Sequence, residues 1–153
     1  MELVSKRFDE LTAREVYEIL KARSAVFMME QRIFYLDMDD IDYDCLHVFY
    51  TENEKVIAYL RAYETEENTV RVGRVLTIER GKGLGRSLME AAIKEICEKM
   101  APKVITIDSQ IQAVGFYEKT GFTVCSDEFM EAGVKHKKME LRITPSYSAP
   151  IAL

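Results

Sequence analysis

Residues 80–87 read Arg80-Gly81-Lys82-Gly83-Leu84-Gly85-Arg86-Ser87 and lie between a segment with strand composition and a segment with helical periodicity. Glycines let the backbone turn sharply and approach a ligand closely. The N-terminus of a following helix presents unpaired N–H groups and a partial positive charge, which suits a phosphate. The stretch therefore predicts a phosphate-binding turn. The alternative is a plain tight turn with solvated basic side chains.

The spacing of the glycines separates this turn from two common nucleotide-binding loops. No Gly-Lys-Ser/Thr follows at the offset of a P-loop, and Arg86 stands where the last glycine of G-x-G-x-x-G would fall. A nucleotide-binding domain nevertheless stays open as an alternative.

The segments around the turn change from strand to helix character. Before it, residues 45–51, 55–63 and 69–78 are rich in β-branched and aromatic residues, which predicts an antiparallel meander. After it, apolar residues recur at helical spacing over 85–100, and Pro102 marks the end of that helix.

The C-terminal part predicts a further strand, helix and strand pair. Residues 104–107 form a short apolar strand, and a strand, helix, strand order favours a parallel crossover. A helix over 111–119 is expected to end at Gly121. Strands are expected at 122–125 and 134–143, with His136 on the polar face of the latter.

The N-terminal part predicts one helix and one loop. Thr12 and Glu15 form a capping box, and the apolar spacing carries the helix to about Met29. Residues 36–44 carry five aspartates, so we expect an exposed, solvated loop. The expected domain covers residues 1–143, and residues 144–153 are expected to form a loosely held tail.

Composition narrows the class of protein. The chain has 153 residues, a net charge of −5, and no apolar run near the roughly 20 residues of a membrane span. The charge argues against a nucleic-acid partner. The three cysteines, Cys45, Cys97 and Cys125, make no metal set with the two histidines, so we expect no metal and a reducing cytoplasm. Cys97 and Cys125 are expected in apolar surroundings.

Two motifs in order carry a family resemblance. Arg80, Gly83 and Gly85 match R/Q-x-x-G-x-G/A, and Gln110-Ile-Gln-Ala113-Val-Gly-Phe116-Tyr117-Glu-Lys119-Thr-Gly121-Phe122 matches N-x-x-A-x-x-F-Y-x-K-x-G-F with Gln110 in place of Asn. The pair resembles the signatures of the GNAT N-acetyltransferases. Residues 22–31, 73–75 and 133–136 are similar to the ElaA-like branch. The resemblance covers about residues 2–143 and implies an α+β (mixed α/β) fold, with a central, mostly antiparallel sheet flanked by helices.

The resemblance implies a role for each matching position. Backbone groups of Val75, Leu76 and Thr77 would bond the pantetheine arm of acetyl-CoA, and residues 80–87 would cradle its pyrophosphate. Gln110 would contact the cofactor arm. Tyr117 would be the acid that protonates the departing thiolate, although a tyrosine in a helix is more often a packed aromatic.

The general base is not decided by the sequence. Glu30, Glu79, Asp108, His47 and His136 are candidates, and Glu30 and His136 rank slightly ahead. Arg74 either orients a carboxylate of the acceptor or neutralises an aspartate of the acidic loop.

The expected activity is transfer of acetyl from acetyl-CoA to a primary amine, directly within a ternary complex. The acceptor is a small molecule or a peptide, no membrane partner is expected, and the resemblance is compatible with a homodimer. The alternative is a non-catalytic acyl-CoA-binding or regulatory module of the same fold.

Overall fold

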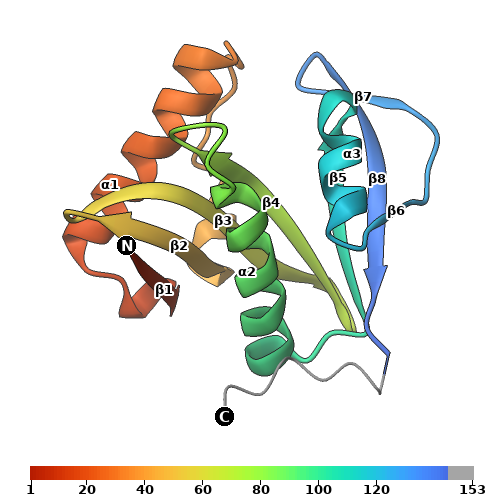
Figure 1. Ribbon diagram of the computed structural model, residues 1–153, viewed down its shortest axis with the longest axis horizontal. Helices are drawn as coiled ribbons and strands as arrows, with labels where there is room; N and C mark the ends of the chain where they lie inside the picture. Colours follow the sequence, from red (N-terminus) through yellow and green to blue (C-terminus); the bar gives the residue numbers. More distant parts are fainter. Residues whose placement is uncertain (145–153) are drawn as a thin grey trace.

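The protein, a computed structural model that describes residues 1–144, contains one mixed eight-stranded sheet (Figure 1). The strand order is β1-β2-β3-β4-β5-β8-β6, and β7 pairs with β8. The strands are β1 (Glu2–Arg7), β2 (Leu46–Glu52), β3 (Lys55–Glu66), β4 (Thr69–Thr77), β5 (Val104–Gln110), β6 (Thr123–Val124), β7 (Phe129–Glu131) and β8 (Val134–Arg142). All neighbouring strands are antiparallel except β4 and β5, which confirms the expected fold class.

The predicted meander is β2, β3 and β4. Asn53 and Glu54 join β2 to β3 with φ angles of 51° and 64°, the left-handed geometry of a two-residue hairpin turn. β1 pairs with β2 at the edge of the sheet and was not predicted. Its short stretch mixes apolar and charged residues, and no residue of it is fully buried, so it lacks a clear alternating signal.

Helices cover both faces of the sheet. The predicted helix 12–29 is α1 (Ala13–Arg23) followed by a π-helix, η2 (Ser24–Glu30), and its capping box is present, with Glu15 N donating to Thr12 Oγ1 at 3.1 Å. The apolar residues that α1 and η2 bury are Ile19, Ala22 and Val26. They pack with Phe49, Tyr59 and Leu76.

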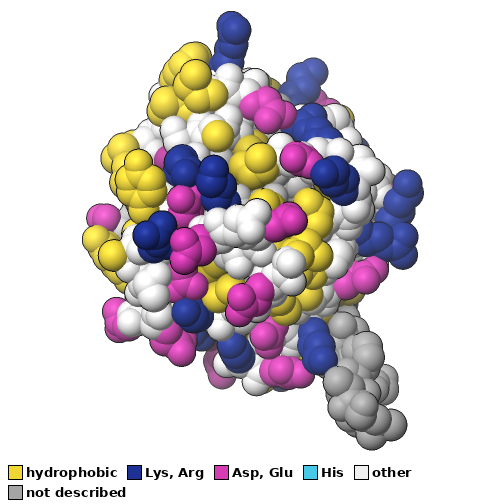
Figure 2. Space-filling model, turned by 60° about the vertical axis from the view of Figure 1, so that its left-hand side comes forward, with side chains coloured by type: hydrophobic (Ala, Val, Ile, Leu, Met, Phe, Trp, Pro, Cys, Tyr) yellow, Lys and Arg dark blue, Asp and Glu magenta, His cyan; other side chains and the backbone are white. Residues whose placement is uncertain are grey.

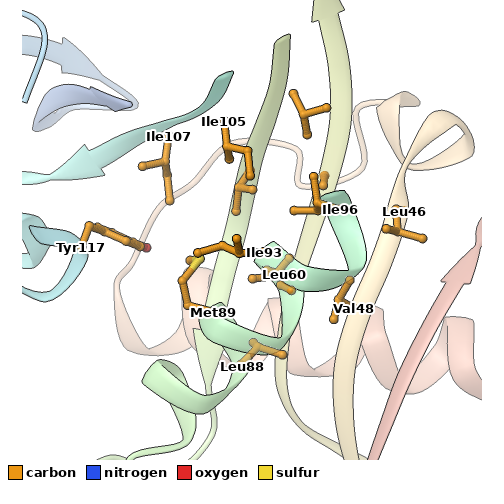
Figure 3. Packing of buried hydrophobic residues seen from close by; sticks show 14 of the residues in the cluster. Leu46, Val48, Leu60, Leu88, Met89, Ile93, Ile96, Ile105, Ile107 and Tyr117 are labelled. Carbon is orange, nitrogen blue, oxygen red and sulfur yellow. The ribbon is translucent and has the colours of Figure 1, made fainter. Parts of the chain in front are cut away.

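The second helix, α2 (Leu84–Met100), buries its apolar stripe in the main core. Leu88, Met89, Ala92, Ile93 and Ile96 pack among side chains of β2, β3, β4 and β5, together with Tyr117 (Figure 3). No helix in the described part of the chain is long and apolar enough to cross a membrane.

β4 and β5 are parallel, as the strand, helix, strand order predicted. They pair only from Thr69 with Val104 to Val72 with Ile107. Beyond these pairs β4 continues to Thr77 and β5 to Gln110 with no shared ladder, and Figure 1 shows the two strands separating. The sheet is therefore open in its middle on the side where α2 begins.

Four predictions for the C-terminal part were wrong in detail. Residues 111–119 divide into a 3₁₀ turn, η4 (Ile111–Ala113), and α3 (Val114–Lys119), and the strand 122–125 is only Thr123–Val124. His136 is buried, not on a polar face, because β7 folds back beside β8 and stacks Phe129 on its ring. Cys125 is exposed, because β6 ends before it.

The acidic loop also differs from its prediction. It contains a 3₁₀ turn, η3 (Ile41–Asp44). Asp40 and Asp44 are exposed as expected, but the other three aspartates, Asp37, Asp39 and Asp42, are neutralised. Buried Arg23 and Arg61 and half-buried Arg74 bind them; the ion pairs are Arg23 with Asp37 and Asp42, Arg61 with Asp39 and Asp42, and Arg74 with Asp37 and Asp39. Three guanidinium groups and three carboxylates balance one another and fasten the loop to the sheet. Apart from Thr144, the expected tail lies outside the described residues.

Candidate active site

A cavity of about 640 Å³ occupies the opening between β4 and β5. Its walls come from Gly73 to Val75 of β4, from Asp108 and Gln110 of β5, and from Tyr117 of α3. The end of η2 and the loop after it close one side, and the turn between β7 and β8 closes the other. Segments far apart in the sequence thus meet around one space.

The glycine turn leads into α2 with free backbone donors. Gly81 and Gly83 have φ angles of 80° and 71°, a region that L side chains rarely adopt. Gly83 is the N-cap residue of α2. No side chain accepts a hydrogen bond from the first N–H groups of α2, and no acidic residue lies in its first turn. A 17-residue helix with an uncapped N-terminus and no acidic residue in its first turn fits a phosphate group.

The basic side chains of the turn all have carboxylate partners. Arg80 pairs with Glu30, Lys82 with Glu79, and Arg86 Nε lies 3.0 Å from Glu90 Oε1. These side chains are exposed, and such pairs contribute at most about 1 kcal/mol. A phosphate could therefore take over these basic groups at small cost.

Gly85 brings the two motifs of the sequence together. A Cβ at this position would lie 3.3 Å from Phe116 Cζ and 3.7 Å from Thr77 Cγ2. Only a residue without a side chain lets Phe116 of α3 pack this closely on the start of α2. Phe116 in turn contacts Tyr117 edge to face, with ring centroids 5.0 Å apart.

β4 carries a bulge beside the cavity. Tyr59 pairs with Leu76 and Arg61 with Gly73, so β4 has one more residue than β3 between these pairs. Arg74 has a φ of 52° there and donates from Nε to Asp37 Oδ1 at 2.9 Å, which supports its role as a partner of the acidic loop. Of the three positions expected to meet the pantetheine arm, Val75 lines the cavity, the Leu76 side chain is buried against α1, and Thr77 lies near Gly85.

Tyr117 lies between the core and the cavity. Its side chain extends from α3 toward Ile107 and Met89 (Figure 3), and it is 6% exposed. Its hydroxyl forms no hydrogen bond to any residue between 1 and 144. Burial raises the pKa of Tyr117 above its ordinary value, so the hydroxyl keeps its proton at neutral pH.

The five candidate bases are separated by the structure. His136 and Asp108 line the cavity, whereas Glu30, Glu79 and His47 do not. Glu30 and Glu79 are paired with Arg80 and Lys82 of the glycine turn. His47 is buried and bonds Tyr59 Oη at 2.7 Å and the Asp42 carbonyl at 2.9 Å, and its burial lowers its pKa.

His136 is oriented by its own strand. Its Nδ1 lies 2.7 Å from the carbonyl oxygen of Val134, which can only accept, so we assign the proton of the neutral ring to Nδ1. Nε2 then carries the lone pair, and a carboxylate oxygen of Glu131 lies 3.9 Å from it.

Two charged residues of the cavity, Arg71 and Glu131, were not found from the sequence. Gln31 also lines the cavity, and its Oε1 accepts a hydrogen bond of 3.1 Å from Gln110 Nε2. Gln110 is therefore tied to the end of η2. A short, charged strand such as β7 gives no periodic signal that would have pointed to Glu131. Among residues 1–144, no group of three His, Cys, Asp or Glu side chains is arranged to hold a metal ion.

Comparison with known families identifies this arrangement. A family model described as an acetyltransferase (GNAT) domain matches residues 10–143. The chain belongs to the GNAT acetyltransferase family. The fold is thus that of an acyl-CoA-dependent acyltransferase, in which acyl-CoA is the co-substrate.

Individual relatives support this membership over nearly the whole chain. A UPF0039 protein of Schizosaccharomyces pombe is 36% identical over 147 residues, covering 94% of this chain and 98% of the relative. The protein ElaA of Escherichia coli is 29% identical over 133 residues, covering 83% of this chain and 87% of ElaA.

Solved GNAT structures have the same fold. The crystal structure of E. coli ElaA superposes with a TM-score of 0.87 at 28% identity, covering 93% of this chain and all of ElaA's. An acyl-CoA N-acyltransferase from Pseudomonas aeruginosa gives a TM-score of 0.86 at 27% identity, with 92% and 99% of the two chains covered. This GNAT chain is therefore similar to ElaA in both sequence and structure.

Proposed function

We propose that this GNAT protein transfers the acetyl group of acetyl-CoA to a primary amine within a ternary complex. The observation that carries the proposal is the opening between β4 and β5, where Tyr117 and the β4 bulge line one cavity, next to the glycine turn at the start of α2. The residues fit the co-substrate. The uncapped helix N-terminus would hold its pyrophosphate, and the edge of β4 that no longer pairs with β5 after Val72 would bond its arm.

Acetyl-CoA, when bound, supplies an acyl carbon activated as a thioester. An alkyl ammonium has a pKa near 10.4, so freeing its lone pair at neutral pH costs about 4–5 kcal/mol. His136 Nε2 is the group we assign to take that proton, because it lines the cavity with its lone pair available. The nitrogen then bonds to the acyl carbon as the carbon–sulfur bond breaks.

We assign the protonation of the sulfur to Tyr117. Because burial keeps it protonated, it can donate a hydrogen bond, and then a proton, to the departing thiolate. In sum, an ammonium ion and an acetyl thioester give an amide, a free thiol and one proton. Backbone donors of β4 can polarise the thioester carbonyl.

Thiol release over a panel of amines, with and without Tyr117→Phe, tests the proposal. We expect the variant to keep its affinity for acetyl-CoA and to lose about 10²-fold or more in kcat, the usual contribution of a general acid. Tyr17→Phe is the matched control, because Tyr17 is exposed on α1, and it should leave kcat unchanged. Binding of acetyl-CoA without thiol release from any amine would favour the non-catalytic module instead.

A further inference from the structure

One wall of the cavity carries an excess of negative charge. Arg71 Nη2 lies 2.5 Å from Asp108 Oδ2 and 3.5 Å from Glu131 Oε1. A single guanidinium is thus shared by two carboxylates, and all three side chains line the cavity. Lys138 is opposite Asp108 in the ladder but is exposed and does not line the cavity. This wall would attract a cation.

The remaining cations of the cavity are already engaged. Arg23 and Arg74 both form ion pairs with Asp37. Arg23 also pairs with Asp42, and Arg74 with Asp39, both from the acidic loop. Within residues 1–144, no arginine or lysine that lines the cavity lacks a carboxylate partner. An acceptor that carries its own carboxylate would therefore find no free cation.

The opposite side of the cavity is apolar and open. Met28, Tyr35, Leu36 and Met38 line it and are nevertheless 41%, 65%, 77% and 52% exposed. Figure 2 shows hydrophobic side chains exposed in groups on the upper and left parts of one face, with acidic and basic side chains adjacent to one another. Exposed apolar side chains at the rim of a cavity are typical of a site that a ligand covers.

Two buried polar groups between these walls also point to a ligand. Tyr117 is 6% and His136 is 7% exposed, and both line the cavity. The Tyr117 hydroxyl has no hydrogen-bond partner among the described residues. Because Tyr117 lines the cavity and its hydroxyl has no partner within residues 1–144, the hydroxyl is available for a hydrogen bond to a molecule bound there.

From this distribution we infer that the acceptor is an amphipathic monoamine. The inference rests on the proposed function. The ammonium group lies at the wall of Asp108 and Glu131, within reach of His136, and the apolar body lies against Met28, Tyr35, Leu36 and Met38. An amino acid would bring an unpaired carboxylate beside Asp37 and Asp108, and a polyamine would place its second charge against apolar side chains.

Matched amines test the substrate class. 2-Phenylethylamine and phenylalanine differ by one carboxylate, and hexylamine and 1,6-diaminohexane differ by one ammonium group. We expect kcat/KM to be at least tenfold higher for the monoamine of each pair. Equal or better turnover of phenylalanine or of the diamine would overturn the inference while leaving the proposed function standing. Absence of thiol release with every amine would instead sink the proposed function.

Variants locate the two halves of the site. Glu131→Gln should raise KM for 2-phenylethylamine at least tenfold without changing KM for acetyl-CoA. Glu128→Gln, immediately before β7 and paired with exposed Lys135, is the control. Leu36→Asp is not expected to disturb folding, since Leu36 is 77% exposed, and it should reverse the order of hexylamine and 1,6-diaminohexane. If Glu131→Gln behaves as Glu128→Gln, and Leu36→Asp leaves the order unchanged, the acceptor does not bind between these walls.

Discussion

Glu30 ends the π-helix η2 and pairs with Arg80 instead of lining the cavity, so a residue considered as the base is engaged at the glycine turn. We expect Glu30→Gln to leave kcat within about twofold of the parent. KM for acetyl-CoA should fall by no more than about fivefold, because an exposed pair contributes up to about 1 kcal/mol and its loss frees Arg80 for a phosphate. Steady-state kinetics with varied acetyl-CoA measures both.

Glu54→Gln provides the comparison for this change. Glu54 pairs with Arg14 at 3.6 Å on the surface, away from the turn, and its loss should alter neither constant. A fall of 10²-fold or more in kcat for Glu30→Gln alone would restore Glu30 as the base and remove His136 from that role.

Gly85 provides a second prediction for a single residue. Gly85→Ala should lower both stability and kcat, because its Cβ displaces Phe116, which packs on Tyr117. Gly115→Ala, in α3 with nothing within 4 Å of its Cβ, should instead raise stability by about 0.5–1 kcal/mol. Urea unfolding and thiol release of the two variants check this. If Gly85→Ala is as stable and active as Gly115→Ala, the close contact of α2 with α3 has no role.

For single residues, the sequence predicted the glycine turn before α2 and the place of Tyr117 in α3 better than the surroundings of the candidate bases. The turn and the tyrosine lie in motifs whose spacing restricts the backbone. The surroundings of His136 depend on β7, whose three residues carry no period, and those of Glu30 depend on a partner 50 residues away. Long-range pairing of charges is invisible in a local pattern.

The acidic loop shows how an element can be misjudged when its partners are distant. Its aspartates predicted a solvated run, but the neutralising arginines come from α1, β3 and β4. The meander, α2 and the capping box were predictable because each is determined by residues that lie close to one another in the sequence. The length of β6 and the existence of β1 and β7 were not predictable, since short strands at the edge of a sheet form only where a partner strand is available.

The ion pairs of this loop make the stability of the protein depend on pH in the acidic range. Hydrogen bonds from Arg61 lower the pKa of Asp39 to about 2, and Arg23 and Arg61 lower the pKa of Asp42 despite its burial. In the unfolded chain these two carboxylates take up protons at a higher pH than in the folded protein. The stabilisation from their ion pairs is therefore complete above about pH 4 and is lost as the pH falls toward 2. The free energy of unfolding in urea should decline across this window.

Asp39→Asn should remove part of that decline. We expect it to lower the free energy of unfolding at pH 7 by about 1 kcal/mol, a figure reduced for the solvent that reaches Asp39. The loss between pH 4 and 2 should become shallower. Asp44→Asn, an exposed aspartate of the same loop, is the control. A slope that is identical in all three proteins would mean that the arginines do not hold the loop.

In the whole molecule, the site exists because the sheet divides. The two motifs, at 80–87 and 110–122, each follow a strand, and the two strands separate after four residue pairs. The order of the motifs predicted that they belong to one fold. The sequence did not show that β4 and β5 would part at Val72 and Ile107, because that depends on how α2, α3 and the bulge at Arg74 pack together.

A ligand that bridges the divided sheet should stabilise the entire domain. CoA at 100 times its dissociation constant adds about 2.7 kcal/mol, which for a chain of this size raises Tm by about 5–10 °C. ATP at the same concentration should produce a clearly smaller shift, because it has no pantetheine arm to fill the opening after Val72. Gly83→Ala should reduce the shift caused by CoA, since its φ of 71° is strained for alanine and the α2 N-terminus would move. Equal shifts with ATP and CoA in the parent would show that the turn binds phosphates alone, and that the separated strands are not the place where an acyl carrier lies.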